Sequence, residues 1–291
     1  MNRAGQTEPG PRAPGFDVSV AHPARIYDYW LGGKDNFAAD RQAAEAVLEV
    51  MPVMAQVART VRLFLATVVH YLAADLGVRQ FLDIGTGLPT ANNTHQVAQR
   101  AAPDARIVYV DNDPIVLSHA RALLSSAPTG RCAYVDADAR DADRVLAEAA
   151  KTLDFTQPVA VMMLGLLHFI PDSDDPYSLA ARYLGAVPAG SYLAVSHASS
   201  DIDSDLLSVA ARSYNTHSAT PITLRSKTEV AGFFRGLDLV PPGIAPLGQW
   251  APGATQAGPG RLPTYTALAH KPDPQAPTHK PRPISTDQAR L

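Results

Sequence analysis

Two acidic residues and two glycines stand at spacings that suit the binding of a nucleotide. Asp83 precedes the turn Gly85-Thr86-Gly87, and Asp111 follows it further along the chain. Glycine has no Cβ, so the chain can turn sharply there and a ligand can approach the backbone N–H groups. A carboxylate such as that of Asp111 can accept hydrogen bonds from both hydroxyls of a ribose. These residues predict a nucleotide site without specifying the nucleotide.

Two strands and a helix must position these residues. Residues 81–84 form a short apolar run that stops at the glycine turn, and residues 107–110 form a second run that stops at Asp111. Between about residues 90 and 102, apolar side chains recur at helical spacing. We therefore expect two buried parallel strands joined by a right-handed helical crossover.

Two details of this turn separate the possible nucleotides. A dinucleotide fingerprint has a third glycine three residues after Gly87, where this chain has Thr90. Asp83 places a negative charge beside the turn, which disfavours a diphosphate and favours a ligand that carries ammonium or sulfonium. Asp-x-Gly-x-Gly followed by a strand-end Asp resembles the first two motifs of class I S-adenosylmethionine-dependent methyltransferases. The alternative is a bare glycine turn between a strand and a helix.

Composition limits the class of protein. The 291 residues are 46% hydrophobic, which is sufficient for one large α/β domain with an extension. The 25 basic and 28 acidic residues give a net charge of −3 without a long basic run, so we expect no nucleic-acid partner. Cys132 is the only cysteine, which fits a reducing cytoplasm. The apolar run 159–167 is too short to cross a membrane, and no histidine spacing predicts a metal site.

The segment 23–41 combines aromatic residues, charges and paired glycines in a short space. One interpretation is a lid over the ligand, in which Tyr27, Tyr29 or Trp30 contacts the sulfonium by cation–π attraction and Gly32-Gly33 acts as a hinge. The alternative is an amphipathic helix that packs on the core and ends at a glycine cap. The residues alone leave both interpretations open.

A wider resemblance accompanies this segment. RIYDYWLGGKDNFAADR, read together with FLDIGTGLPT, VYVDNDP and TPITLRS, is similar to an S-adenosyl methyltransferase family typical of actinobacteria, long described as a domain of unknown function. The resemblance covers about residues 21–270. It implies class I methyltransferase architecture and S-adenosyl-L-methionine as cofactor, but it specifies no substrate.

The expected fold is therefore α/β and Rossmann-like, with a seven-stranded, mostly parallel sheet whose last strand is antiparallel. Residues 21–75 should form an N-terminal helical lid and residues 76–270 the methyltransferase domain. Residues 1–20 and 271–291 should be disordered tails. Arg62, on a predicted helix of the lid, is expected on a solvated face.

The resemblance also indicates which residues contact the cofactor. In class I methyltransferases an acid after the third strand accepts the adenine amino group, and the motif selects Asp138 over Asp136. The full set of expected cofactor contacts comprises Asp83, Gly85, Thr86, Gly87, Asp111, Asn112, Asp138, Ala139, Tyr29, Gly33 and Asn36.

Two histidines follow the later strands. His168 lies in the loop after the strand predicted at 159–167, where ligands bind in parallel sheets, and it is our candidate base near the methyl group. A histidine that only packs or bonds to the backbone is the alternative. His197 is a weaker candidate, and residues 214–225 form the expected insertion on the substrate side.

We interpret the chain as a methyltransferase that acts on a small molecule by in-line displacement. Two alternatives remain: a non-catalytic protein that senses S-adenosylmethionine or S-adenosylhomocysteine, and an NAD-dependent oxidoreductase, which Asp83 and Thr90 disfavour. The oligomeric state and the methyl acceptor do not follow from the sequence.

Overall fold

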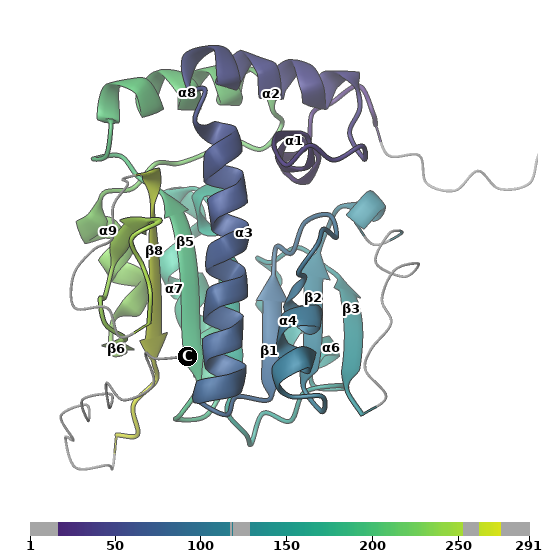
Figure 1. Cartoon of the computed structure of the whole chain (residues 1–291), viewed down its shortest axis with the longest axis vertical. Helices are drawn as coiled ribbons and strands as arrows, with labels where there is room; N and C mark the ends of the chain where they lie inside the picture. The colour runs from purple at the N-terminus through teal and green to yellow at the C-terminus, as the bar shows by residue number, and fades with distance from the viewer. Residues whose placement is uncertain (1–16, 117, 119–128, 253–261, 275–291) are drawn as a thin grey trace, which may run out of the picture.

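A twisted sheet forms the centre of the molecule (Figure 1). The computed structural model describes residues 17–116, 118, 129–252 and 262–274. Within them the sheet has eight strands in the order β3-β2-β1-β4-β5-β8-β6, with β7 also paired to β8. The strands are β1 (Gln80–Ile84), β2 (Arg106–Asp111), β3 (Arg131–Asp136), β4 (Ala160–Leu164), β5 (Tyr192–Ala198), β6 (Asp238–Leu239), β7 (Ala245–Leu247) and β8 (Leu262–His270).

The sequence predicts most of this sheet correctly. Strands β1 to β5 are mutually parallel, and β8 runs antiparallel to β5. The predicted number of seven strands is one too low, because the strand expected at residues 237–244 contains only the short β6, and β7 is an additional short strand that follows it. Both short strands pair with β8, and a Pro-Pro-Gly turn separates β6 from β7 along the chain.

Helices cover both faces of the sheet, because alternate residues of each strand point to opposite sides. On one face Leu82 and Ile84 pack with helices α6 and α7, and on the other Phe81 packs with α3 and α4. The helices around the sheet are α3 (Met54–His70), α4 (Thr94–Ala101), α6 (Ala142–Ala149), α7 (Pro176–Gly185) and α9 (Lys227–Ala231).

Three further helices lie above the carboxyl ends of β1 to β5 (Figure 1). They are α1 (Pro23–Trp30), α2 (Ala38–Val50) and α8 (Ser204–His217). Ile26, Ala44, Leu207 and Tyr214 are among the residues that give this layer its own small hydrophobic core. We call α1, α2 and α8 the cap.

The cap differs from the lid expected at residues 21–75. Helix α3 packs along the sheet with Phe81 and Ile107, so it belongs to the central core. Helix α8 comes from the second half of the chain but packs on α2 and completes the cap. By length and composition alone, Met54–Asp75 could cross a membrane. Its apolar side chains pack on the sheet instead, which accounts for this composition.

Some predictions fall at the edge of the described residues. The helix expected after Pro114 begins there, with Asp113 Oδ1 accepting the Ile115 N–H at 2.8 Å as an N-cap should. Its residues 117 and 119–128 lie outside the described part. Both expected tails lie largely outside it as well.

Candidate cofactor and acceptor site

The glycine turn follows β1 in a conformation that other residues rarely adopt. Gly85 and Gly87 have φ angles of 71° and 66°, in the left-handed region. A Cβ at Gly85 would lie 2.8 Å from a side-chain carbon of Leu166, whereas a Cβ at Gly87 would meet no atom within 4 Å. The left-handed backbone favours glycine at both positions; Gly85 packs closely on the Leu166 side chain, whereas Gly87 borders open space where a ligand can approach.

Asp83 is a buried acid beside this turn. Its Oδ2 accepts a hydrogen bond of 2.6 Å from the Thr94 hydroxyl, and burial raises its pKa to about 6. Arg62 opposes that rise by its charge. Arg62 lines the cavity and donates exposed hydrogen bonds to the carbonyls of Ala91 and Asn92, so this half-exposed residue stands at the edge of the cavity as well as towards solvent.

Asp111 stands at the end of β2, facing the turn. Its Oδ2 accepts the Gly87 N–H at 2.8 Å and its Oδ1 accepts the Asp113 N–H at 2.9 Å. Burial raises the pKa of this carboxyl above its ordinary value. Each oxygen retains a second lone pair, which fits the predicted role of accepting ribose hydroxyls.

The third strand supplies the next acid. Asp138, Ala139 and Asn112 line the same cavity as Asp111. Arg140 holds the Asp138 carboxylate with two side-chain bonds of 3.0 and 2.6 Å, and these bonds lower its pKa. Asp136 is exposed and does not line the cavity, so of the two acids only Asp138 can reach a ligand there.

Three residues of the N-terminal segment do not take the predicted places. Asn36 donates to Asp28 at 2.8 Å, and a Cβ on Gly33 would collide with the same carboxylate. Tyr29 turns outward and donates to Glu45 at 2.8 Å. None of these three lines the cavity among the described residues. Gly33 and Asn36 close a loop around Asp28 instead.

The paired glycines of this segment cap helix α1. The Gly32 N–H donates to Tyr29 O and the Gly33 N–H to Asp28 O, both at 2.9 Å, which is a Schellman motif with Gly32 at φ 81°. The glycine-cap interpretation is thus confirmed for the loop. The lid interpretation keeps support from Tyr27 and Trp30, which line the cavity.

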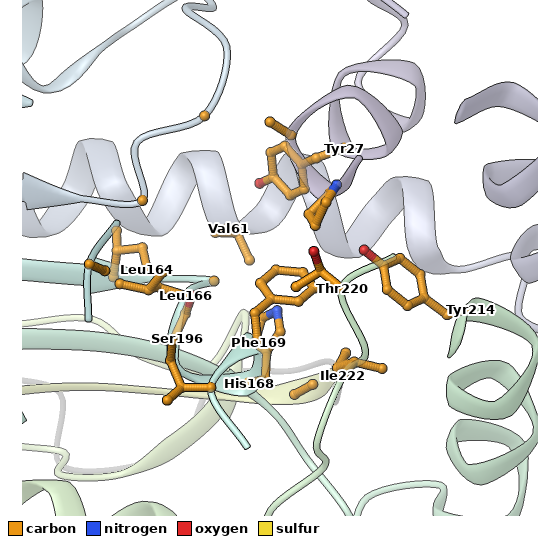
Figure 2. Close-up of a pocket in the computed structure, with 18 of the residues that line it drawn as sticks. Tyr27, Val61, Leu164, Leu166, His168, Phe169, Ser196, Tyr214, Thr220 and Ile222 are labelled. Carbon is orange, nitrogen blue, oxygen red and sulfur yellow. The ribbon is translucent and has the colours of Figure 1, made fainter. Parts of the chain in front are cut away.

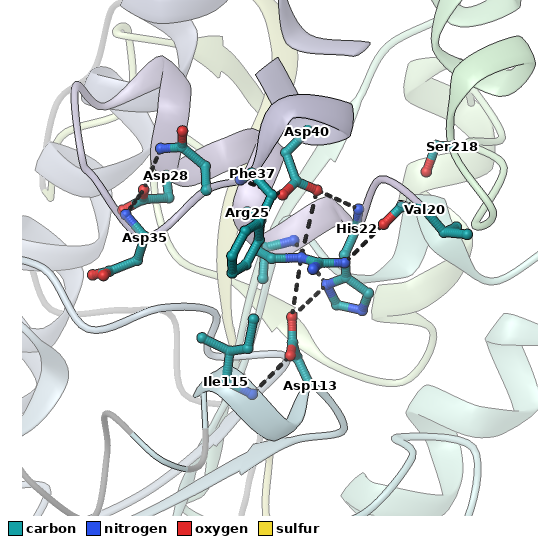
Figure 3. A network of polar contacts seen from close by, with 12 residues as sticks. Val20, His22, Arg25, Asp28, Asp35, Phe37, Asp40, Asp113, Ile115 and Ser218 are labelled. Atoms are coloured by element: carbon teal, nitrogen blue, oxygen red, sulfur yellow. Dashed lines mark hydrogen bonds and ion pairs between the residues drawn. The ribbon is translucent and has the colours of Figure 1, made fainter. Parts of the chain in front are cut away.

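A buried polar network joins the cap to the end of β2 (Figure 3). Arg25 lies between Asp40 of α2 and Asp113, at 3.4 and 3.8 Å from their carboxylates. His22 Nδ1 lies 2.9 Å from Asp113 Oδ2. Burial alone would raise the Asp113 pKa, but His22, the Ile115 N–H and Arg25 together lower it. Because Asp113 also donates its N–H to Asp111, the network extends to the Asp111 carboxylate at the end of β2.

His168 lines the cavity beyond the glycine turn, in a short 3-10 turn after β4. Its Nδ1 is buried without a hydrogen-bond partner. Burial, with the neighbouring His197 and Arg225, holds the His168 pKa well below its ordinary value. The imidazole is therefore neutral at pH 7 and its unpartnered nitrogen is available to a ligand.

His197 has a structural role, so its proposal as a site residue was wrong. It is fully buried, and its Nδ1 lies 2.8 Å from the Ala198 carbonyl while its Nε2 lies 2.9 Å from Arg225. Because a guanidinium only donates, Nε2 is the acceptor and Nδ1 carries the proton. Burial lowers the His197 pKa to about 4. Both ring nitrogens are occupied, and His197 does not line the cavity.

Sequence reasoning missed Arg225, the buried centre of this region. Its side chain is 1% exposed and donates to Leu167 O, Ile170 O and the Asp172 carboxylate at 2.9, 2.9 and 2.6 Å. It thereby fixes the loop that carries His168. The only signal in the sequence was the presence of Arg225 in the TPITLRS motif.

One continuous cavity of about 450 Å³ connects these parts (Figure 2). At one end it is lined by the strand-end residues Asp83, Gly87, Asp111 and Asp138. At the other end it is lined by the cap, by α3 and by residues 219–222 and 224 of the predicted insertion. Its volume is in the range of small-molecule sites, which run from about 300 to 1,000 Å³.

The residues at the strand end fit S-adenosylmethionine. Asp111 suits the ribose, Asp138 the adenine amino group, and the open face of Gly87 the approach of the amino-acid part. The acid Asp83 and the absence of a third glycine at Thr90 oppose a diphosphate in the same place. Fold and site together define a class I S-adenosylmethionine-dependent methyltransferase.

Comparison with known proteins specifies the family. The sequence model of a family described as S-adenosyl methyltransferase matches residues 10–272, and the chain belongs to this family. The resemblance inferred from the motifs is thereby confirmed, as is S-adenosylmethionine as the cofactor of the family. No curated protein matches the sequence.

Solved structures give the same result. A DUF574 family protein from Streptomyces avermitilis MA-4680 is 43% identical, with a TM-score of 0.84, over 88% of this chain and 99% of that one. A candidate methyltransferase from Thermobifida fusca YX is 35% identical, with a TM-score of 0.81, over 89% and 98%. An O-methyltransferase family protein from Burkholderia thailandensis is 15% identical, with a TM-score of 0.52, over 85% and 64%, and it shows the fold alone.

Within the described residues, no group of three or more His, Cys, Asp or Glu side chains is placed to hold a metal ion.

Proposed function

We propose that this protein transfers the methyl group of S-adenosylmethionine to a small molecule held between the sheet and the cap. The observation that carries the proposal is the single cavity that runs from the Asp111 end of the sheet to the underside of α8. A site for the cofactor alone would need only the strand end. The apolar half beyond His168 is room for an acceptor.

The cofactor, when bound, supplies an electrophilic methyl group on a sulfonium. The Asp111 carboxylate holds the ribose, the open face of Gly87 lies against the amino-acid part, and Asp138 receives the adenine amino group. Tyr27, whose hydroxyl donates to Ala58 O at 2.8 Å, presents its ring to the cavity for the cation. His168 accepts the proton that the acceptor loses. The cap excludes water from the reacting atoms.

A non-catalytic sensor is the main competing function. A sensor needs the cofactor end but has no use for a second compartment, so the extended cavity favours the enzyme. An NAD-dependent oxidoreductase is opposed by Asp83 beside the turn. A cytoplasmic location and the absence of a nucleic-acid partner stay part of this proposal and rest on the composition.

The test is transfer of a labelled methyl group. The protein would be incubated with S-adenosylmethionine labelled in the methyl group and with pooled small molecules, and label in the pool would be compared with S-adenosylhomocysteine released. We expect the two to appear in equal amounts. Tight binding of S-adenosylhomocysteine without transfer to any pool would contradict the enzyme and support the sensor.

A further inference from the structure

The two ends of the cavity differ in charge. The ionised side chains that line it, Asp83, Asp111, Asp138, Arg62 and Arg140, all belong to the ends of β1 to β3 or to the helix beside them. The other end, here called the acceptor half, is lined by uncharged side chains that include Val57, Val61, Phe169, Leu207, Tyr214 and Ile222. Among the described lining residues of this half, His168 alone is titratable below pH 9, and it is neutral at pH 7.

Three polar atoms in this apolar setting, Ser196 Oγ, His168 Nδ1 and the Tyr214 hydroxyl oxygen, have no hydrogen-bond partner among the described residues. Ser196 is 1% exposed, and its Oγ is buried without a hydrogen bond. The Nδ1 of His168 is buried in the same way. An unsatisfied buried polar group costs about 1–3 kcal/mol, so such groups usually mark a ligand or a function.

Of these, Ser196 Oγ and His168 Nδ1 belong to residues at neighbouring strand ends, whereas Tyr214 lies on α8. Ser196 is on β5, and its carbonyl accepts the N–H of Gly165, three residues before His168. Both residues line the cavity, and β5 lies two strands from β1, on the side away from β2 and β3. Ser196 and His168 thus border the acceptor half, where Figure 2 shows both among the residues around the cavity.

We propose that the methyl acceptor is an uncharged, largely apolar molecule whose reacting hydroxyl faces Ser196 Oγ and His168 Nδ1. The inference rests on the proposed function. The hydroxyl oxygen forms the new bond to the methyl carbon, the carbon–sulfur bond breaks with its electron pair left on sulfur, and the hydroxyl proton passes to His168 Nδ1 and then to water. The products are a methyl ether and S-adenosylhomocysteine.

The same lining rejects charged acceptors. A carboxylate or an ammonium in the acceptor half would lose its hydration without meeting an opposite charge, which is strongly unfavourable. An aromatic hydroxyl compound would instead place its ring against Phe169 and the aliphatic side chains and its hydroxyl against the two polar atoms.

Calorimetric titration of the protein saturated with S-adenosylhomocysteine tests the charge selectivity. The probes are 2-naphthol, 6-hydroxy-2-naphthoate, which adds a carboxylate, and 6-(aminomethyl)-2-naphthol, which adds an ammonium. We expect 2-naphthol to bind at least tenfold more tightly than either charged probe. Equal or tighter binding of a charged probe, or no binding of 2-naphthol, would overturn the proposal.

A second comparison tests the hydroxyl contact. 2-Methylnaphthalene has the shape of 2-naphthol without its hydroxyl, so the affinity ratio of the two probes reports the hydrogen bonds alone. In Ser196→Ala we expect this ratio to fall roughly fivefold, the scale of one hydrogen bond. An unchanged ratio in a variant that still binds S-adenosylhomocysteine would contradict the assignment of Ser196.

Because the protein is first saturated with S-adenosylhomocysteine, the experiment distinguishes a failure of this inference from a failure of the proposed function. If S-adenosylhomocysteine binds and label is transferred to charged acceptors, the methyltransferase proposal stands and the acceptor class is wrong. If S-adenosylhomocysteine does not bind at all, both are wrong.

Discussion

Gly87 and Gly85 share a conformation but have different functions at the residue scale. Both have positive φ, yet only Gly87 faces open space. We expect Gly87→Val to fold and to lose cofactor binding, because its side chain fills the approach to the backbone. The matched control is Gly77→Val, since Gly77 has φ 70°, open space and an exposed position at the opposite end of β1 from the turn.

Circular dichroism and titration with S-adenosylhomocysteine on the same samples measure this difference. Both variants should show a similar loss of stability from backbone strain, about 1–2 kcal/mol. Only Gly87→Val should lose affinity. Normal binding by Gly87→Val would mean that the turn does not contact the cofactor.

His197 should make the stability depend on pH in a defined direction. Its folded-state pKa of about 4 lies below the ordinary value of 6.5, so the unfolded chain binds the proton first as pH falls. The contribution of His197 to the free energy of unfolding is fully present above pH 6.5. It is lost as pH falls towards 4, by about 3 kcal/mol in total. His168 acts in the same direction, whereas Asp83, with its pKa raised to about 6, opposes it.

Urea unfolding of the wild type and of His197→Gln at pH 7 and pH 5 measures how much of the pH dependence of stability is due to His197. Glutamine can still accept the bond from Arg225 but does not titrate. We expect the variant to lose less stability than the wild type between the two pH values. An equal loss would show that His197 is not held neutral.

At the scale of elements, Arg225 connects the predicted insertion to the loop of His168. Replacement by methionine leaves the carbonyls of Leu167 and Ile170 without their donor, and we expect a loss of about 3 kcal/mol or more in unfolding free energy. Arg182→Met, which removes an exposed ion pair with Asp143, should cost no more than about 1 kcal/mol. Similar losses in urea unfolding for the two variants would contradict the role of Arg225.

Helix α1 is predicted to tighten over the bound cofactor. It is joined to Asp113 through Arg25, and Tyr27 and Trp30 line the cavity. Hydrogen exchange in residues 23–30 should slow on addition of S-adenosylhomocysteine, while exchange in α6, which packs on the sheet, should not change. If hydrogen exchange in α1 does not change when the ligand is added, the helix has a structural role and does not close over the cofactor.

Local sequence patterns predicted the elements better than their contacts. The strands and the glycine turn were recognisable because each apolar run stops at a glycine or an acid. The role of Gly33 and Asn36 was not, because it depends on where one side chain, Asp28, points. Arg225 was missed for a similar reason, since its partner Leu167 lies 58 residues earlier in the chain.

At the scale of the whole molecule, the cap encloses the cavity above the carboxyl edge of the sheet. The sheet presents the cofactor residues at one edge, as parallel α/β sheets do. Helices from both halves of the sequence then meet above that edge, and their separate hydrophobic core holds them together. The number of strands and the membership of α8 in the cap depend on such long-range packing, which a single sequence does not display.

The central claim is that Asp111 and its neighbours bind S-adenosylmethionine. Calorimetric titration of the wild type, Asp111→Ala and Asp136→Ala with S-adenosylmethionine tests it most directly, because the two acids are in register on adjacent strands and only Asp111 lines the cavity. We predict one site per chain, affinity weaker by about 1.5–3 kcal/mol in Asp111→Ala, the scale of a hydrogen bond to a charged group, and no change in Asp136→Ala. Equal affinities for all three proteins, or binding of NADH in place of S-adenosylmethionine, would contradict the account.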